Sequence, residues 1–193
     1  MTLPPDLEVR PARPGDEAGI AALVAACDES YRAWTPPGWE PPPPGAELDR
    51  WRGRIIDGSW WTRIGLEPGD RVVALVCFTQ AVVQRTLPGP PGRPAPGPRA
   101  AHGGVVTVEP VPGRAHISAV FTHPDRWREG IASGLLRLAE DAMRAEGYRT
   151  VQLWTPREAP ARRFYEAEGW RTDGRQQWLE ELALPIVAYV KPL

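Results

Sequence analysis

The segment from residue 115 to residue 147 constrains the fold most, because a strand, a loop and a helix follow one another there without interruption. Residues 115–122 are a strand candidate, and the loop 123–129 connects it to Gly130. A helix is predicted from Gly130 to a stop at Gly147. Its inner face carries apolar residues at helical spacing: Ile131, Leu135, Leu136, Ala139 and Met143.

The rest of the chain predicts strands and helices in mixed order. A first helix is expected from the helical spacing of Ile20, Val24, Cys27 and Tyr31. Two more helices are expected over residues 46–57 and 161–168. Further strands are expected over residues 7–10, 60–66, 71–83, 105–109, 150–155, 175–179 and 185–191, with 105–109 and 115–122 joined at Pro112 and Gly113. The order β-α-α-β-β-β-α-β-α-β-β predicts an α/β layer fold.

Prolines interrupt this pattern in two places. Residues 34–45 read WTPPGWEPPPPG, which predicts a rigid loop rather than helix or central strand. Residues 85–104 are a Pro/Gly-rich loop insertion. A length of 193 residues fits one domain over residues 1–193.

Composition narrows the class of partner. A formal net charge of −1 gives no general attraction for nucleic acid or an anionic membrane, so a small molecule is expected. The opening MTLPPDLEVR lacks a signal-peptide pattern, which predicts a cytoplasmic location. Cys27 and Cys77 lie in apolar runs without metal-ligand spacing, so buried reduced thiols and no metal site are predicted.

The start of the helix at Gly130 is a candidate anion site. Gly130 and Ala132 allow a ligand to approach the backbone, and first-turn N–H groups have no partner inside the helix, so a diphosphate can satisfy them. Neither a Gly-Lys-Ser/Thr loop nor a GxGxxG fingerprint is present. A glycine at a helix start is, by itself, often only a cap.

Two motifs in the expected order resemble the GNAT superfamily of acetyltransferases. Its signature (Gln/Arg)-x-x-Gly-x-(Gly/Ala) is similar to residues 127–132, WREGIA, with Trp127 at the Gln/Arg position. The preceding ISAVFTHP and the later RRFYEAEGW, residues 162–170, resemble two further family patterns. The resemblance covers most of the chain except residues 85–104.

The resemblance implies acetyl-CoA, or a close acyl-CoA, as the cofactor. It also implies a mixed central sheet with helices on both faces, in which the fourth and fifth strands splay apart and leave backbone groups for the cofactor's pantetheine arm. The implied cofactor-binding residues are Val120, Phe121, Thr122, Trp127, Arg128, Glu129, Gly130, Ile131, Ala132 and Ser133. The family's Asn falls here on Glu158, which leaves that contact unassigned.

Three residues are candidates for the chemistry. Tyr165 resembles the family's general acid, since a phenol with a pKa of ~10 stays protonated at neutral pH; the alternative is a core tyrosine. His116 lies where several family members carry a base, and its unperturbed pKa of ~6.5 suits that task, unless it is a structural histidine. Ser118, two residues further along, is a candidate relay or amine-binding group.

The acceptor is expected to be an amine on a small molecule. Trp34 and Trp39 lie in the proline-stiffened loop, where they form either a ligand wall or a cover over the core edge. Glu40 and Glu47 are acidic candidates for attracting a cationic amine. The aromatic rings favour an acceptor with a bulky or aromatic body.

Two other functions stay open. One is a degenerate acyl-CoA-binding regulatory module without turnover, and the other is a protein-interaction domain that presents the proline tracts at 41–44 and 87–98. Dimers are frequent in the resembled family, so a homodimer is also open.

Overall fold

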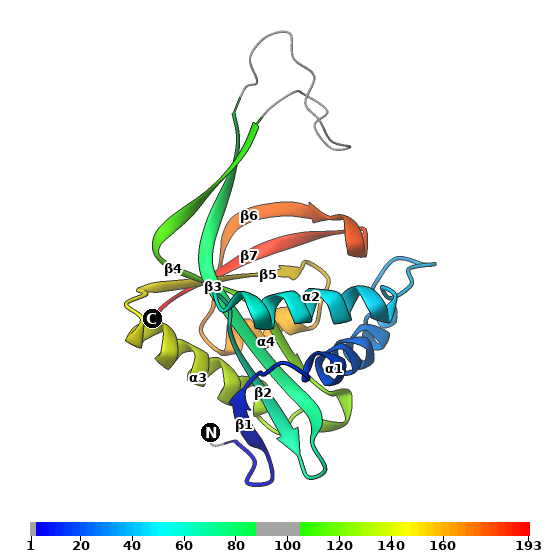
Figure 1. Cartoon of the computed structure of the whole chain (residues 1–193). Coiled ribbons are helices and arrows are strands. Elements are labelled where there is room, and N and C mark those ends of the chain that lie inside the picture. The colour runs from blue at the N-terminus through cyan, green and yellow to red at the C-terminus, as the bar shows by residue number, and fades with distance from the viewer. Residues whose placement is uncertain (1–2, 88–104) are drawn as a thin grey trace.

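A computed structural model describes residues 3–87 and 105–193, and a seven-stranded sheet forms its centre (Figure 1). The strand order is β1-β2-β3-β4-β5-β7-β6, and only the pair β4 and β5 is parallel. The strands are β1 Glu8–Pro11, β2 Trp61–Glu67, β3 Arg71–Leu87, β4 Val105–Thr122, β5 Thr150–Pro156, β6 Arg171–Leu179 and β7 Leu184–Pro192. The predicted mixed α/β fold is confirmed.

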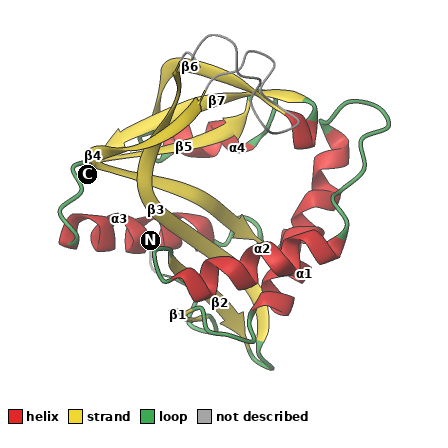
Figure 2. Cartoon of the chain, turned by 45° about the horizontal axis from the view of Figure 1, so that its top comes forward, coloured by secondary structure: helices red, strands yellow, loops and turns green. Residues whose placement is uncertain are grey.

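Helices cover both faces of this sheet (Figure 2). They are α1 Glu17–Glu29, α2 Pro44–Asp57, α3 Ile131–Ala145 and α4 Ala161–Ala167, with short 3₁₀ turns η1 Ser30–Ala33, η2 Pro124–Arg126 and η3 Glu180–Leu182. One core cluster holds Ile20, Trp51 and Leu75 under α1 and α2. The other holds Leu135 and Val151 under α3, with Phe164 and Tyr165 of α4 packed against it.

The two strand candidates at 105–109 and 115–122, joined at Pro112 and Gly113, form one strand, β4. The pairing with β3 passes from Gln80–Ala115 to Val82–Pro110, which leaves residues 111–114 as a bulge. The Gln80 amide donates to the carbonyl oxygens of Val111 at 2.6 Å and Arg114 at 3.0 Å. The bulge therefore absorbs Pro112 and Gly113 without ending the strand.

Two predicted boundaries also shift. Helix α2 begins at Pro44 rather than residue 46, because proline is well tolerated at the first helical position, where its missing N–H is not needed. Strand β3 runs to Leu87, so residues 85–87 are strand rather than loop, and they pair with residues 105–107. The remaining part of the predicted insertion, 88–104, and almost all of the 87–98 proline tract lie outside the described residues.

Strands β4 and β5 pair over four residues each, 114–117 on β4 and 150–153 on β5. The last paired residues are Ile117 and Leu153. Beyond them β4 continues to Thr122 against β3, while β5 continues to Pro156 against β7. The expected splay of the fourth and fifth strands is confirmed, and it leaves one side of β4 without a strand partner from residue 118 onward.

Both cysteines are buried and free, as predicted. Burial raises the pKa of the Cys27 thiol to about 12 and also raises that of Cys77, so neither is a nucleophile at neutral pH. In the described ranges, 3–87 and 105–193, no helix has the length and apolar character needed to span a bilayer.

Candidate active site

Ser118 is a bulge residue at the point where β4 leaves β5. Cys77 pairs with Ala119 and Phe78 pairs with Ile117, so Ser118 has no partner on β3. The extra residue reverses the faces of the strand: Ile117 packs in the α3 cluster, whereas Ala119 packs under α1 and α2. The predicted relay residue therefore sits at the apex of the splay.

Beyond this bulge, alternate residues of β4 turn their backbone toward the gap. The N–H of His123 donates to the carbonyl oxygen of Val73 at 2.8 Å, so odd-numbered residues face β3. Val120 and Thr122 consequently face the gap, and Phe121 faces β3. The Thr122 carbonyl oxygen accepts from the indole Nε1 of Trp127 at 2.7 Å and from the Cys27 thiol at 3.4 Å.

The cradle loop, residues 127–132, presents backbone N–H groups at the start of α3. Arg128 and Gly130 have positive φ angles of 68° and 78°. The first bond of α3 runs from the N–H of Gly134 to the carbonyl of Gly130. No described residue accepts a hydrogen bond from the N–H groups of Gly130, Ile131 or Ala132. Successive free N–H groups at a helix start form an anion site.

The side chains of several predicted cofactor residues are already engaged elsewhere. Ile131 is in the core at 1% exposure, the Ser133 hydroxyl donates to Glu168, and Glu129 pairs with Arg126 at 2.8 Å. At these positions only the backbone is available to a ligand. Glu158, at the position of the family's Asn, pairs with Arg157 at 3.1 Å.

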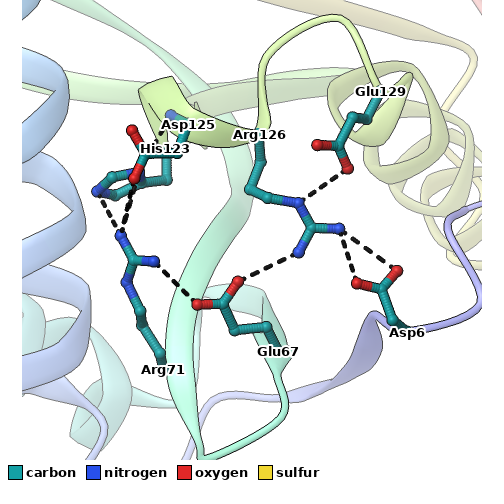
Figure 3. A network of polar contacts seen from close by, with 7 residues as sticks. All are labelled: Asp6, Glu67, Arg71, His123, Asp125, Arg126 and Glu129. Atoms are coloured by element: carbon teal, nitrogen blue, oxygen red, sulfur yellow. Dashed lines mark hydrogen bonds and ion pairs between the residues drawn. The ribbon is translucent and has the colours of Figure 1, made fainter.

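An ion-pair network connects the cradle loop, through Glu129, to other segments of the chain (Figure 3). Arg126 contacts three carboxylates: Glu129 at 2.8 Å, Asp6 at 3.1 Å and Glu67 at 3.2 Å. Glu67 also pairs with Arg71 at 2.9 Å, and these hydrogen bonds hold its pKa below its usual value. The network joins the loop before α3 to the chain before β1 and to the β2–β3 turn.

Tyr165 lies on α4 with its ring among other aromatic rings. The centroids of Phe164, Trp170 and Tyr189 lie 5.3, 6.0 and 6.2 Å away. Burial raises the pKa of Tyr165 to about 12. Its hydroxyl makes no hydrogen bond to any residue that the structure describes, so its proton is uncommitted.

His116 differs from the expected base. It lies between Thr79 on β3 and Gln152 on β5, one rung before the splay. Burial lowers its pKa to about 4, against the opposing effect of a backbone hydrogen bond at Gln152. The imidazole is therefore neutral at pH ~7, and the base role of His116 stays a prediction beside its structural alternative. Its Nδ1 is buried and unpartnered among the described residues.

Trp34 and Trp39 gather around Tyr31 of η1. The ring centroids of Trp34 and Trp39 lie 4.8 and 6.3 Å from that of Tyr31. Burial is the main cause that raises the Tyr31 pKa. The aromatic cluster Tyr31–Trp34–Trp39 lies in the connection between α1 and α2.

Comparison with known proteins decides the family. The model of the acetyltransferase (GNAT) family matches residues 24–170, which include the cradle loop, β4, β5 and α4. The chain belongs to this family. The acetyltransferase uses acetyl-CoA, the acyl donor of the family. The free N–H groups of the cradle loop and the open side of β4 fit such a donor.

Solved structures with the same fold cover almost the whole acetyltransferase. They include PaiA N-acetyltransferase from Thermoplasma acidophilum in complex with coenzyme A, with 10% identity, a TM-score of 0.64, and coverage of 94% of this chain and 97% of that one. An N-acetyltransferase from Staphylococcus aureus has 16% identity, a TM-score of 0.63, and coverage of 96% and 98%. An acetyltransferase from Thermus thermophilus has 16% identity, a TM-score of 0.62, and coverage of 100% of both chains. No curated protein sequence matches significantly.

Two acidic candidates are already paired in the acetyltransferase. Glu40 pairs with Arg32 at 2.7 Å, and Glu47 pairs with Arg50 at 2.7 Å and accepts from the Trp51 indole at 3.1 Å. Across the described ranges, no group of three or more His, Cys, Asp or Glu side chains is arranged to hold a metal ion.

Sequence reasoning missed Asp28 and overlooked Tyr31 as a site residue. Asp28 is 8% exposed in the last turn of α1, next to Cys27. A lone carboxylate near a helix end normally faces solvent, and only its place one turn after the apolar Val24 hinted at burial. The sequence signal for Tyr31 was its helical spacing from Cys27, which predicted a core residue.

Proposed function

We propose that the acetyltransferase acetylates an amine of a small molecule with a bulky or aromatic body, by direct transfer in a ternary complex. A single domain over residues 1–193 would carry both the donor and the acceptor sites. The observation that carries this proposal is the uncommitted hydroxyl of Tyr165, in a fold that also leaves the edge of β4 open beyond Ile117.

The donor side uses backbone rather than side chains. The N–H groups of Gly130, Ile131 and Ala132 bind the diphosphate, favoured by the positive end of the α3 dipole. The backbone of Val120 binds the pantetheine arm. Trp127 holds the Thr122 carbonyl, which keeps the open edge of β4 beside the cradle loop.

The chemistry needs a thioester, a nucleophilic amine and a proton for the departing thiolate. Acetyl-CoA, when bound, supplies the thioester whose carbonyl carbon the amine attacks. Tyr165 donates its proton to the leaving sulfur as the C–S bond breaks, since a pKa of about 12 keeps the phenol protonated over the whole neutral range. The nitrogen that forms the new C–N bond releases one proton to solvent, and the Tyr165 phenolate takes one back from solvent. A backbone N–H of Val120 is available to polarise the thioester carbonyl.

The acceptor side is formed by residues from the α1–α2 connection. Trp34 and Trp39 bind a flat or bulky body, and Ser118 hydrogen-bonds the amine; the ring cluster around Tyr31 and the bulge at Ser118 support these roles. His116 acts as a neutral acceptor of a hydrogen bond, because its lowered pKa makes it a weak base.

A coupled assay of coenzyme A release tests this proposal. Purified protein with acetyl-CoA is supplied with a panel of aliphatic amines, aromatic amines, amino acids and polyamines. We expect amine-dependent release that is fastest with amines on an aromatic body. Acetyl-CoA binding by calorimetry without release for any amine would instead support the regulatory module.

A further inference from the structure

Asp28 is a buried carboxylate without a partner. It is 8% exposed, and no described residue donates a hydrogen bond to its side chain or forms an ion pair with it. Buried charged groups in proteins are normally paired, because removing a charge from water is costly. The neighbouring acid Glu47 follows this rule through Arg50 and Trp51. Asp28 therefore stands out as a carboxylate that lacks its counter-charge.

The groups around Asp28 explain why none of the described residues pairs with it. On α2, Glu47 repels its charge, and Arg50 attracts it only at a distance, since its guanidinium is engaged by Glu47. On its own helix, Glu29 repels it and Cys27 is an uncharged thiol. Tyr31 of η1 is a neutral phenol. Burial and Glu47 together raise the pKa of Asp28 to about 6.

The position of Asp28 connects it to the acetyl-transfer site. The preceding residue, Cys27, donates from its thiol to the carbonyl of Thr122, which fixes the end of α1 against the end of β4. Asp28 stands three residues before Tyr31, whose ring centroid lies 4.8 Å from that of Trp34. The carboxylate thus lies at the end of α1, between the contact with β4 and the aromatic cluster in the sequence.

We infer that Asp28 binds the ammonium group of a cationic acceptor, and so selects alkylamines over uncharged amines. This inference rests on the proposed function and adds the charge state in which the acceptor binds. The bound cation supplies the counter-charge that the protein lacks, while the aromatic rings of Trp34 and Trp39 contact the body of the same molecule. At neutral pH the carboxylate is ionised and the acceptor is protonated, so the two attract. The bound ammonium must then release one proton to solvent before its nitrogen attacks the thioester.

The test uses Asp28→Asn with Glu29→Gln as a matched control, since Glu29 is an adjacent exposed carboxylate that pairs with Arg32. The probes are phenethylamine, which is a cation at pH ~8, and aniline, which is uncharged there. Calorimetry of acetyl-CoA binding accompanies each variant. We expect Asp28→Asn to raise KM for phenethylamine by roughly tenfold or more. The KM for aniline and the acetyl-CoA affinity should change little. An unchanged KM for phenethylamine would overturn the inference.

A binding measurement separates this inference from the proposed function, because it needs no turnover. Phenethylamine alone should raise the melting temperature of the wild-type protein and of Glu29→Gln, and should raise that of Asp28→Asn much less. Equal shifts in all three proteins, or no shift in any, would overturn the role of Asp28. Absence of acetylation with a selective shift would overturn the proposed reaction and leave the cation site standing.

The stability of the free protein provides a second, structural check. Without ligand, Asp28→Asn should melt at a higher temperature than wild type above pH ~6, because it removes an unpaired buried charge. A lower melting temperature, with Glu29→Gln unchanged, would show that Asp28 has a structural partner and would overturn the inference.

Discussion

The indole nitrogen of Trp127 donates a hydrogen bond of 2.7 Å to the carbonyl oxygen of Thr122, and this bond joins the cradle loop to the end of β4. Trp127→Phe keeps an aromatic ring and removes the donor. We expect a loss of about 1 kcal/mol in the free energy of unfolding and a roughly fivefold weaker affinity for acetyl-CoA. Calorimetry and thermal melting measure the two effects. Trp178→Phe, at another exposed tryptophan, is the control. An unchanged acetyl-CoA affinity in Trp127→Phe would contradict this role.

Gly130 and Gly147 provide a matched pair for testing the cradle loop. They flank α3, and their φ angles are 78° and 85°, so an alanine is strained at either position by about 1 kcal/mol. Both variants should therefore lose similar stability. Only Gly130→Ala should also weaken acetyl-CoA binding, because only its N–H faces the proposed diphosphate. Equal affinities in the two variants would remove the cradle loop from the donor site.

The charged variant Ala132→Glu tests the same site by a different physical effect. A carboxylate on the first turn of α3 would repel the diphosphate and fill the space beside the free N–H groups. We expect acetyl-CoA binding to be abolished with little change in melting temperature, since Ala132 is only partly buried. A folded Ala132→Glu protein that binds acetyl-CoA normally would argue against a diphosphate there.

The lowered pKa of His116 determines the direction in which this residue changes the stability of the fold with pH. The folded pKa of about 4 lies below the unfolded value of ~6.5, so the folded state binds fewer protons between them. Its contribution to stability is present above pH ~6.5 and is lost as the pH falls toward about 4. Melting of His116→Asn across this range should show a weaker loss in acid than wild type.

The lowered pKa of His116 and the raised pKa of Asp28 together predict how kcat/KM depends on pH. An acidic limb of kcat/KM near pH 6 should persist in His116→Asn, because Asp28, with a pKa of about 6, is the group that titrates there. The limb should vanish in Asp28→Asn. A limb near pH 6.5 that disappears with His116 would restore the histidine as the general base.

Substitutions in the aromatic cluster distinguish two roles for its rings, binding of the acceptor or covering of the core. If Trp34 and Trp39 bind the acceptor, then Trp34→Ala and Trp39→Ala should raise its KM without changing the affinity for acetyl-CoA. Both tryptophans are only partly buried, so the melting temperature should fall only slightly. Equal losses of both affinities with a much lower melting temperature would make these rings structural.

Local patterns predicted the order of elements well, because strands, helices and their glycine stops depend on near neighbours. The α3 segment shows this best, since its apolar spacing and its start at Gly130 both agree with the structure. The bulge that carries β4 past Pro112 and Gly113 has a tertiary cause. Gln80, on the neighbouring strand, satisfies the carbonyl groups of the bulge at 111–114, and no pattern within 105–122 reveals this.

The site was less predictable because its properties arise from packing. The pKa of His116 depends on burial between β3 and β5, which the residue type does not indicate. The pKa of Asp28 is raised by burial and by Glu47 on α2, which local sequence does not show. Glu47 itself is a poor candidate for binding an amine, because Arg50 and Trp51 already pair with its carboxylate. The backbone cradle was easier to predict, because the small residues of the family motif mark the start of a helix.

The most direct test of the account is the single-turnover rate of Tyr165→Phe with bound acetyl-CoA and a reactive amine. The substitution keeps the ring contacts with Phe164 and Trp170 and removes only the hydroxyl. Tyr189→Phe is the control, because the Tyr189 hydroxyl already donates to Glu166. The account predicts a rate lowered roughly 10²- to 10⁴-fold in Tyr165→Phe, with acetyl-CoA affinity unchanged. A rate equal to that of wild type would contradict leaving-group protonation by Tyr165.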